Sequence, residues 1–276
     1  MHSVNQTTEL FLFWLAFIAY SLTCVLYIVY FGFEIKRIAR AASVTMAFGL
    51  ALHTAALIVR SVHSRHLPLT NMFEYISLLA WFATCFYFVF LKIYKQHFLG
   101  AFIVFTVFML MVSGSLLPKD VTMQLVPALQ SYWLQIHVTL ASLGEAGFLV
   151  AFAVNIMYFV KSALPESSRF GARLPDKNIL DRIAYKAICI GYPLFTVGAL
   201  FAGAIWAEQS WGSFWSWDPK EVGSLVVWLV YSVYLHARRV KRWSGMRATI
   251  LSATGFIFTL LTFFANLILG GLHSYG

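Results

Sequence analysis

The sequence predicts an all-α polytopic membrane protein with about eight transmembrane helices. Its composition is 60% hydrophobic and only 11% charged, with a mean hydropathy of +0.76. A soluble domain of this composition would expose far more apolar surface to water than globular proteins do. Apolar stretches of about 20 residues, the length a helix needs to cross a hydrocarbon core of about 30 Å, recur along the chain. These observations exclude a soluble domain and indicate a membrane bundle.

Eight apolar stretches follow one another along the chain, each of membrane-crossing length or close to it. Their predicted bounds are 10–32, 41–62, 73–94, 98–117, 136–160, 184–207, 221–237 and 247–270. The first has no basic segment before it and no A-x-A cleavage pattern after it, so we expect a retained helix. Asp218, Pro219 and Glu221 have the N-cap, N1 and N3 residue types with which a helix begins. Asn71 and Glu74 predict a similar start for the third helix.

The connections carry no separate domain. Residues 161–183 combine prolines, a glycine and mixed charges, which predicts a solvated linker. Residues 117–135 contain the short amphipathic segment VTMQLVPAL, which we expect to lie in the membrane interface as a lid. With no repeat or low-complexity segment, we expect one integral membrane domain over 1–276, with its tryptophan-rich segment 206–221 in an outer loop.

The basic residues predict the orientation. If the N-terminus is outside, sixteen of the twenty Lys and Arg residues fall in inner loops. Four remain at the outer side or its boundary, namely Arg60, Arg65, Lys119 and Lys220. Both termini are therefore expected on the outer side. This asymmetry and contact with anionic lipid explain the net charge of +9, which gives no support to nucleic-acid binding.

The three cysteines predict no thiol chemistry. Cys24, Cys85 and Cys189 all fall inside predicted helices, and no C-x-x-C pair is present. We expect them to be buried small hydrophobic residues. The chain therefore has no attachment site for a covalent c-type haem of its own.

Four of the nine tryptophans lie between positions 206 and 217. Trp211, Trp215 and Trp217 predict a flat apolar surface that suits a planar ligand such as a porphyrin, because aromatic faces stack on π-systems. The alternative is an interfacial aromatic belt, which membrane proteins commonly build from Trp and Tyr.

Two histidines are expected at the depth of these tryptophans. His137 opens the fifth predicted helix and His273 follows the last one, both on the outer side. Neutral imidazoles that approach from opposite sides can form an axial pair for haem iron. The alternative is two unrelated interfacial histidines.

His236 is expected in a different place. It follows Asp218 by eighteen residues on the same predicted helix, so it lies about 27 Å deeper, near the inner leaflet. It is either a second haem ligand or a histidine that reaches the interface beside Arg238 and Arg239. His53, nearer the middle of the second helix, is a candidate partner, although its depth differs from that of His236. A partner protein is the other source of the missing ligand.

The segment WGSFWSWDPKE at 211–221 resembles the WWD signature of a haem-handling family. Together with His137, His236 and His273 and the segment PLTNMFEY at 68–75, it is similar to the CcsA/ResC branch (CcsB in some bacterial naming) of System II cytochrome c biogenesis. The resemblance covers nearly the whole chain. Eight spans with both ends outside fit this branch better than the shorter, six-span CcmC.

The resemblance implies a haem export and presentation subunit of a cytochrome c synthase, which is an enzyme only as part of a haem-lyase complex. Haem b would pass noncovalently from His236 to the outer site and be offered to the C-x-x-C-H thiols of apocytochrome c. The residues implied at that outer site are His137, His273, Trp211, Trp215, Trp217 and Asp218. None is expected to be catalytic, because the protein would position haem rather than supply a nucleophile.

The resemblance also implies a ResB-type membrane partner and a location in the bacterial inner membrane, or in the thylakoid membrane of a plastid or cyanobacterium. Three alternatives remain open at this stage. They are CcmC-like loading of a haem chaperone, a cytochrome b-type subunit for quinol electron transfer, and a transporter of another small molecule.

Overall fold

The computed structural model describes residues 2–120 and 125–269, and the side chains of residues 6–120 and 125–263. Every regular element in these segments is helical. The chain forms two compact units, Met1–Leu125 (unit 1) and Val126–Gly276 (unit 2). Whether residues 1–276 act as a single haem-handling domain is a question of function, and that expectation stays a prediction.

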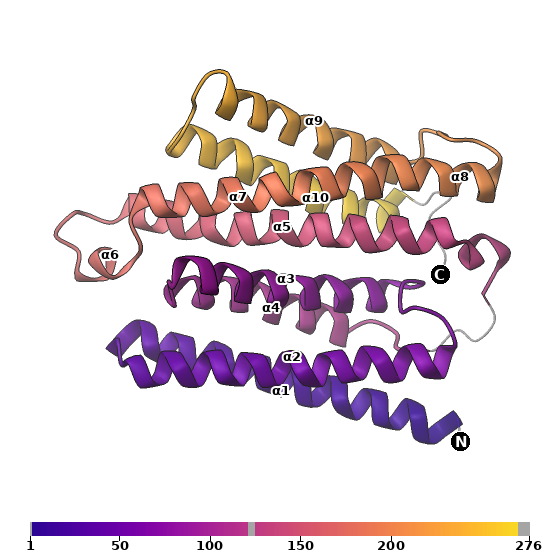
Figure 1. Ribbon diagram of the computed structural model, residues 1–276, viewed down its shortest axis with the longest axis horizontal. Helices are drawn as coiled ribbons and strands as arrows, with labels where there is room; N and C mark the ends of the chain where they lie inside the picture. Colours follow the sequence, from indigo (N-terminus) through magenta and orange to yellow (C-terminus); the bar gives the residue numbers. More distant parts are fainter. Residues whose placement is uncertain (1, 121–124, 270–276) are drawn as a thin grey trace. The chain divides into compact units, whose positions relative to one another are not determined.

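Unit 1 is a bundle of four helices that run alternately up and down (Figure 1). They are α1 (His2–Phe33), α2 (Lys36–Ser64), α3 (Met72–Tyr94) and α4 (Phe98–Ser115). Helix α1 packs against α2 and α4, and α3 packs against α4 and α2. The predicted start of α3 is confirmed, because the Asn71 side chain accepts a hydrogen bond of 2.9 Å from the Glu74 backbone N–H. Short connections make neighbouring helices antiparallel.

Unit 2 is built around one long helix, α5 (Figure 1). Its elements are η1 (Pro127–Gln130), α5 (Tyr132–Ala163), α6 (Arg169–Arg173), α7 (Lys177–Phe195), η2 (Thr196–Ala202), α8 (Gly203–Trp211), α9 (Pro219–Arg239) and α10 (Met246–Leu269). Helix α5 packs against α7, η2, α8 and α10. The approach to α7 is close, since a Cβ on Gly191 would lie 2.6 Å from the Gly144 carbonyl oxygen. Small residues allow such backbone contact between membrane helices.

Seven helices of the described segments are long and apolar enough to cross a membrane. One of them is the continuous rod Lys177–Trp211, formed by α7, η2 and α8. Helix α9, the predicted span 221–237, is not among the seven. It has 21 residues, but the charged residues at both of its ends lower its mean hydropathy. The all-α polytopic prediction is confirmed, with seven candidate spans among the described residues where eight were predicted. The orientation in the membrane stays a prediction.

One local prediction is corrected, and one is not tested. The lid expected within residues 117–135 stays a prediction, because residues 121–124 lie outside the described part of the chain; after them, Pro127–Gln130 forms a short 3-10 turn. The cysteines are less buried than predicted, because Cys24 and Cys85 are half-buried and Cys189, on α7, is exposed. Lipid tails are as apolar as a protein core, so an apolar residue on a membrane helix does not have to face inward.

Candidate functional site

His137 lies in the first turns of α5, with one ring nitrogen fixed by the backbone. Its Nδ1 is 2.9 Å from the carbonyl oxygen of Gly198. A carbonyl can only accept, so Nδ1 carries the proton and Nε2 carries the lone pair. Histidines that bind metals commonly donate their second ring N–H to a carbonyl in this way. The half-buried imidazole is therefore held in the form that can bind iron through Nε2.

The carbonyl that holds His137 belongs to a π-helical turn. Gly198 lies within η2, where the Gly203 backbone N–H also donates to the Gly198 oxygen. This i→i+5 pattern is wider than an α-turn and often occurs at functional sites. Because Gly198 and Gly203 have no side chains, this turn can approach α5 closely.

Trp206 packs against the ring of His137. The two rings are parallel, with centroids 5.7 Å apart and an interplanar angle of 10°. Trp206 is 2% exposed, and its Nε1 donates a 2.7 Å hydrogen bond to the Ala128 carbonyl oxygen in η1. Trp206 therefore connects the histidine to the segment that precedes α5.

Asp218 begins α9 as predicted. Its carboxylate accepts a 2.9 Å hydrogen bond from the Lys220 backbone N–H, while the Asp218 N–H donates to Glu221 at 3.3 Å. These bonds form a capping box with Pro219 in the first turn. Glu221 also accepts a bond of 2.8 Å from the Ser216 backbone N–H. The carboxylates of Asp218 and Glu221 thus stabilise the end of the tryptophan segment.

The aromatic surface is angled, and the prediction of a flat surface is wrong. The rings of Trp215 and Trp217 meet at 89°, with centroids 5.8 Å apart. Trp211, at the end of α8, packs edge-on against Trp206 at 66°. The reason is the turn into the Asp218 cap, for which Trp217 takes a left-handed backbone conformation with φ 59°. Such a conformation costs roughly 1–3 kcal/mol and persists only where the surrounding structure holds it.

The structure brings His137 and the tryptophan segment together. A cavity of about 30 Å³ is lined by residues from α5, η2, α8, the tryptophan segment and α9, among them His137, Gly203, Trp215, Lys220 and Glu221. Beside it, Phe214 and Trp217 are 58% and 71% exposed. The site therefore has a small interior next to the imidazole and a large aromatic surface outside it.

Two other predicted ligands are not part of this cavity. His236 is exposed in the last turn of α9, and the helix is unbroken from Pro219 to Arg239. The predicted separation of about 27 Å from Asp218 therefore agrees with the structure. His273 lies outside the described residues.

His53 is placed differently from the predicted ligand. It is fully buried in unit 1, with Nε2 2.8 Å from the Ser77 hydroxyl oxygen and Nδ1 3.3 Å from the Tyr20 hydroxyl oxygen. Both ring nitrogens thus have hydrogen-bonding neighbours, and iron would have to displace one of them. The geometry gives no support to a ligand role for His53.

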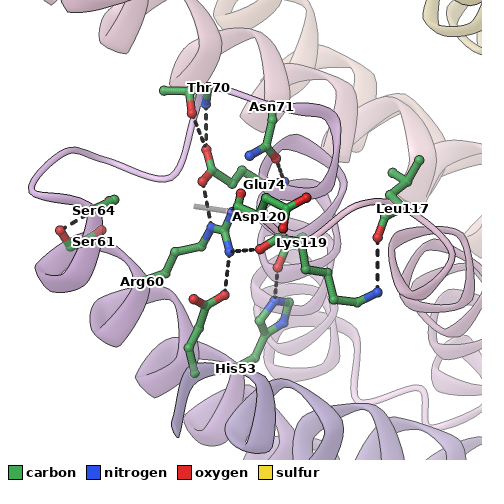
Figure 2. Close-up of polar contacts among 12 residues, drawn as sticks. His53, Arg60, Ser61, Ser64, Thr70, Asn71, Glu74, Leu117, Lys119 and Asp120 are labelled. Carbon is green, nitrogen blue, oxygen red and sulfur yellow. Dashed lines mark hydrogen bonds and ion pairs between the residues drawn. The ribbon is translucent and has the colours of Figure 1, made fainter. Parts of the chain in front are cut away.

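A buried ionic cluster in unit 1 was not predicted. Arg60 on α2 donates to Glu9 on α1 and to Glu74 on α3, each at 2.6 Å. Figure 2 shows Arg60 beside Glu74, Lys119 and Asp120. It also donates to the backbone oxygens of Lys119 at 3.2 Å and Asp120 at 3.1 Å. We call Glu9, Arg60 and Glu74 the Arg60 cluster. Its members are far apart in the sequence, so charge patterning alone could not pair them.

A model of the family described as "Cytochrome C assembly protein" matches residues 69–273. The chain belongs to the cytochrome c assembly family. The match contains the 211–221 segment, His137, His236 and His273, and it begins after His53. The membership confirms the resemblance on which the sequence-based interpretation rested.

Curated relatives carry the name "Cytochrome c biogenesis protein CcsA". The protein of Chlamydomonas reinhardtii is 37% identical over 229 residues, 80% of this chain and 64% of that protein. The protein of Synechocystis sp. is 32% identical over 320 residues, 95% of each chain. The chain thus spans about two thirds of the first relative and nearly all of the second. The chain is an integral membrane protein of the CcsA type.

Among solved structures, "Cytochrome c Heme Lyase CcmF" has a similar fold. The TM-score is 0.71 at 16% sequence identity, over 94% of this chain and 46% of that one. At this identity the similarity is one of fold alone, and it agrees with the all-α polytopic architecture.

Proposed function

We propose that the protein holds haem b noncovalently at an outer site formed by His137 and the segment 206–221, and presents it for attachment to apocytochrome c. It would act as a subunit of a System II cytochrome c synthase. The observation that carries the proposal is the His137–Gly198 hydrogen bond, which leaves Nε2 unprotonated and able to bind iron beside the tryptophan segment. Membership of the cytochrome c assembly family supports it.

The residues present fit haem in chemistry. A neutral imidazole is an ordinary axial ligand of haem iron, and the exposed rings of Phe214 and Trp217 offer faces for a porphyrin. A porphyrin is much larger than the cavity of about 30 Å³ beside His137. The macrocycle would therefore lie largely on the outer aromatic surface, with His137 reaching it through the cavity.

Haem supplies iron for the imidazoles and two vinyl groups, across which the cysteine S–H bonds add to form thioethers. In the proposal His137 and His273 would bind the iron, while Trp211, Trp215 and Trp217 would contact the ring. Asp218 contributes by fixing the tryptophan segment through its helix cap. The protein's contribution is orientation of the reacting groups, which can account for several kcal/mol of a reaction barrier.

An inner haem site at His236 is part of the proposal. His236 is exposed on α9, and both nitrogens of His53 are engaged elsewhere. The second inner ligand is accordingly assigned to the ResB-type partner rather than to His53.

The experiment is reconstitution in a bacterial host that lacks its own cytochrome c assembly. The chain is expressed with its ResB-type partner and an apocytochrome c that carries C-x-x-C-H, and the haem that remains on the cytochrome after denaturation is measured. We expect covalent haem, reduced in Trp217→Ala but not in Trp14→Ala, an exposed tryptophan of unit 1. Haem bound by the chain without a covalent product would favour CcmC-like loading. A chain without haem would refute the proposal.

A further inference from the structure

The π-helical turn of unit 2 is shaped around the ring of His137. The Gly198 carbonyl oxygen holds Nδ1 at 2.9 Å, and Trp206 covers one ring face at a centroid distance of 5.7 Å. A Cβ on Gly203 would lie 2.9 Å from Nδ1 and 3.0 Å from Cε1 of the imidazole. Such distances are shorter than van der Waals contact, so the ring occupies this position only because residue 203 has no side chain.

Gly198 brings the turn to the histidine. A Cβ at this position would lie 2.4 Å from the backbone nitrogen of Ala141, one helical turn after His137 on α5. Any side chain at 198 would push η2 away from α5 and lengthen the bond to Nδ1. The two glycines therefore have separate tasks: Gly198 sets the distance between the helices, and Gly203 leaves room for the ring.

The i→i+5 backbone hydrogen bond of the π-helical turn explains why these two positions act together. Gly203 donates its N–H to the oxygen of Gly198, five residues earlier, so both glycines lie on the same side of one turn. The Gly198 oxygen accepts from the Gly203 N–H and from His137 Nδ1, which uses both of its lone pairs.

We propose that Gly198 and Gly203 are positioning residues that select the Nδ1–H tautomer of His137 and direct Nε2 toward the haem. This inference deepens the proposed function and rests on it for the identity of the ligand. A donated Nδ1–H fixes the ring orientation and raises the basicity of Nε2, as outer hydrogen bonds do for metal-binding histidines. The turn thus prepares the ligand before haem arrives.

The direct test is nitrogen NMR of the haem-free full chain with ¹⁵N-labelled histidine, in which His137→Gln identifies the His137 signals. Chemical shifts distinguish a protonated from an unprotonated ring nitrogen. We expect protonated Nδ1 and unprotonated Nε2 in the wild type. The opposite tautomer, or an equal mixture, would overturn the inference. The tautomer is read from the wild type, and a variant is used only to assign the His137 signals.

Gly203→Ala tests the role of the turn. We expect loss of the pure Nδ1–H signature, and in the complex with the ResB-type partner a decrease in haem affinity of about 10–100-fold. Gly32→Ala is the matched control, because a Cβ there meets nothing within 4 Å. It should keep both the tautomer and the affinity of the wild type. A Gly203→Ala protein with the wild-type tautomer and haem affinity would contradict the inference.

The two proposals fail in different ways. A wild-type chain with the Nδ1–H tautomer but no haem in its complex would refute the proposed function and leave the selection of the tautomer intact. Bound haem lost in His137→Ala, together with an Nε2–H tautomer in the haem-free wild type, would refute the positioning role and leave the function intact.

Discussion

His53 in unit 1 and His137 in unit 2 both lie on long apolar helices, and they differ in how their ring nitrogens are used. His53 is fully buried, with Ser77 beside one nitrogen and Tyr20 beside the other. His137 is half-buried and has one nitrogen on a backbone carbonyl, while a small cavity adjoins its ring. A candidate ligand is therefore distinguished from a structural histidine by its remaining hydrogen-bonding capacity rather than by its position on a membrane helix.

The charged groups of the two units show a parallel difference. In unit 1 the Arg60 cluster is buried and joins α1, α2 and α3 to the residues after α4. In unit 2 the carboxylates of Asp218 and Glu221 cap α9 and hold the tryptophan segment, in which Trp217 stays exposed. The Arg60 cluster therefore joins helices, whereas Asp218 and Glu221 hold a segment with an exposed aromatic surface.

The largest expected effect is that of Arg60→Met, which tests whether the polar groups of unit 1 are structural. The substitution leaves Glu9 and Glu74 buried without their cation, and we expect a loss of about 3–5 kcal/mol in the free energy of unfolding. Thermal unfolding in detergent, followed by circular dichroism, measures it. Arg65→Met, at an exposed arginine of the same helix end, is the control and should unfold like the wild type. Equal unfolding midpoints for the two variants would contradict a structural role of the Arg60 cluster.

The second prediction concerns the two histidines directly. His137→Ala should lower the haem affinity of the complex by at least about tenfold, because even the outer partners of metal ligands have effects of that size. His53→Ala should keep the haem-to-protein ratio and lose about 1–3 kcal/mol of stability, since the Ser77 and Tyr20 hydroxyls lose a buried partner. Pyridine haemochrome absorbance per protein measures the ratio. Loss of haem in His53→Ala alone would reverse the assignment.

Trp206→Phe tests how much the indole packed against His137 contributes to stability and to haem binding. Phenylalanine keeps an aromatic face beside the imidazole but removes the bond from Nε1 to the Ala128 carbonyl oxygen. We expect a loss of about 1 kcal/mol in stability and a haem affinity that falls less than in His137→Ala. Thermal unfolding and the same haem assay test this. A larger loss of haem than in His137→Ala would show that Trp206, rather than the imidazole, dominates binding.

The smallest effect is expected for Ser77→Ala, which removes one partner of His53. Hydrogen bonds between membrane helices contribute about 0.6 kcal/mol on average, so the unfolding free energy should fall by about that amount. Ser252→Ala, which removes the partner of the buried Asn155 in unit 2, is the matched variant and should have a similar effect. Both should retain haem. A haem deficit specific to Ser77→Ala would connect His53 to the haem site.

Features that depend on neighbouring residues in the sequence were predictable. The apolar lengths predicted the helices, and Asp218, Pro219 and Glu221 predicted the capped start of α9. The WGSFWSWDPKE segment and the placed histidines indicated the family, which the match over residues 69–273 confirms. Each of these signals lies in a continuous stretch of sequence and can be interpreted without knowing which distant segments it contacts.

Features that depend on contacts between distant segments could not be predicted. The pairing of Arg60 with Glu9 and Glu74 requires three helices to meet, and the engagement of His53 requires α1 and α3. The π-turn at Gly198 had one weak signal, two glycines five residues apart that follow Pro193 inside the helix. The right angle between Trp215 and Trp217 follows from a backbone turn, which residue types alone do not specify.

Haem binding at His137 is tested most directly by the reduced visible absorption spectrum and the haem-to-protein ratio of the full chain, purified in detergent with its ResB-type partner. We predict a b-type spectrum whose haem is released by denaturing extraction, in the wild type and in His53→Ala, and a reduced haem content in His137→Ala. A colourless, well-folded wild-type complex, or a haem content that does not change in His137→Ala, would contradict the account.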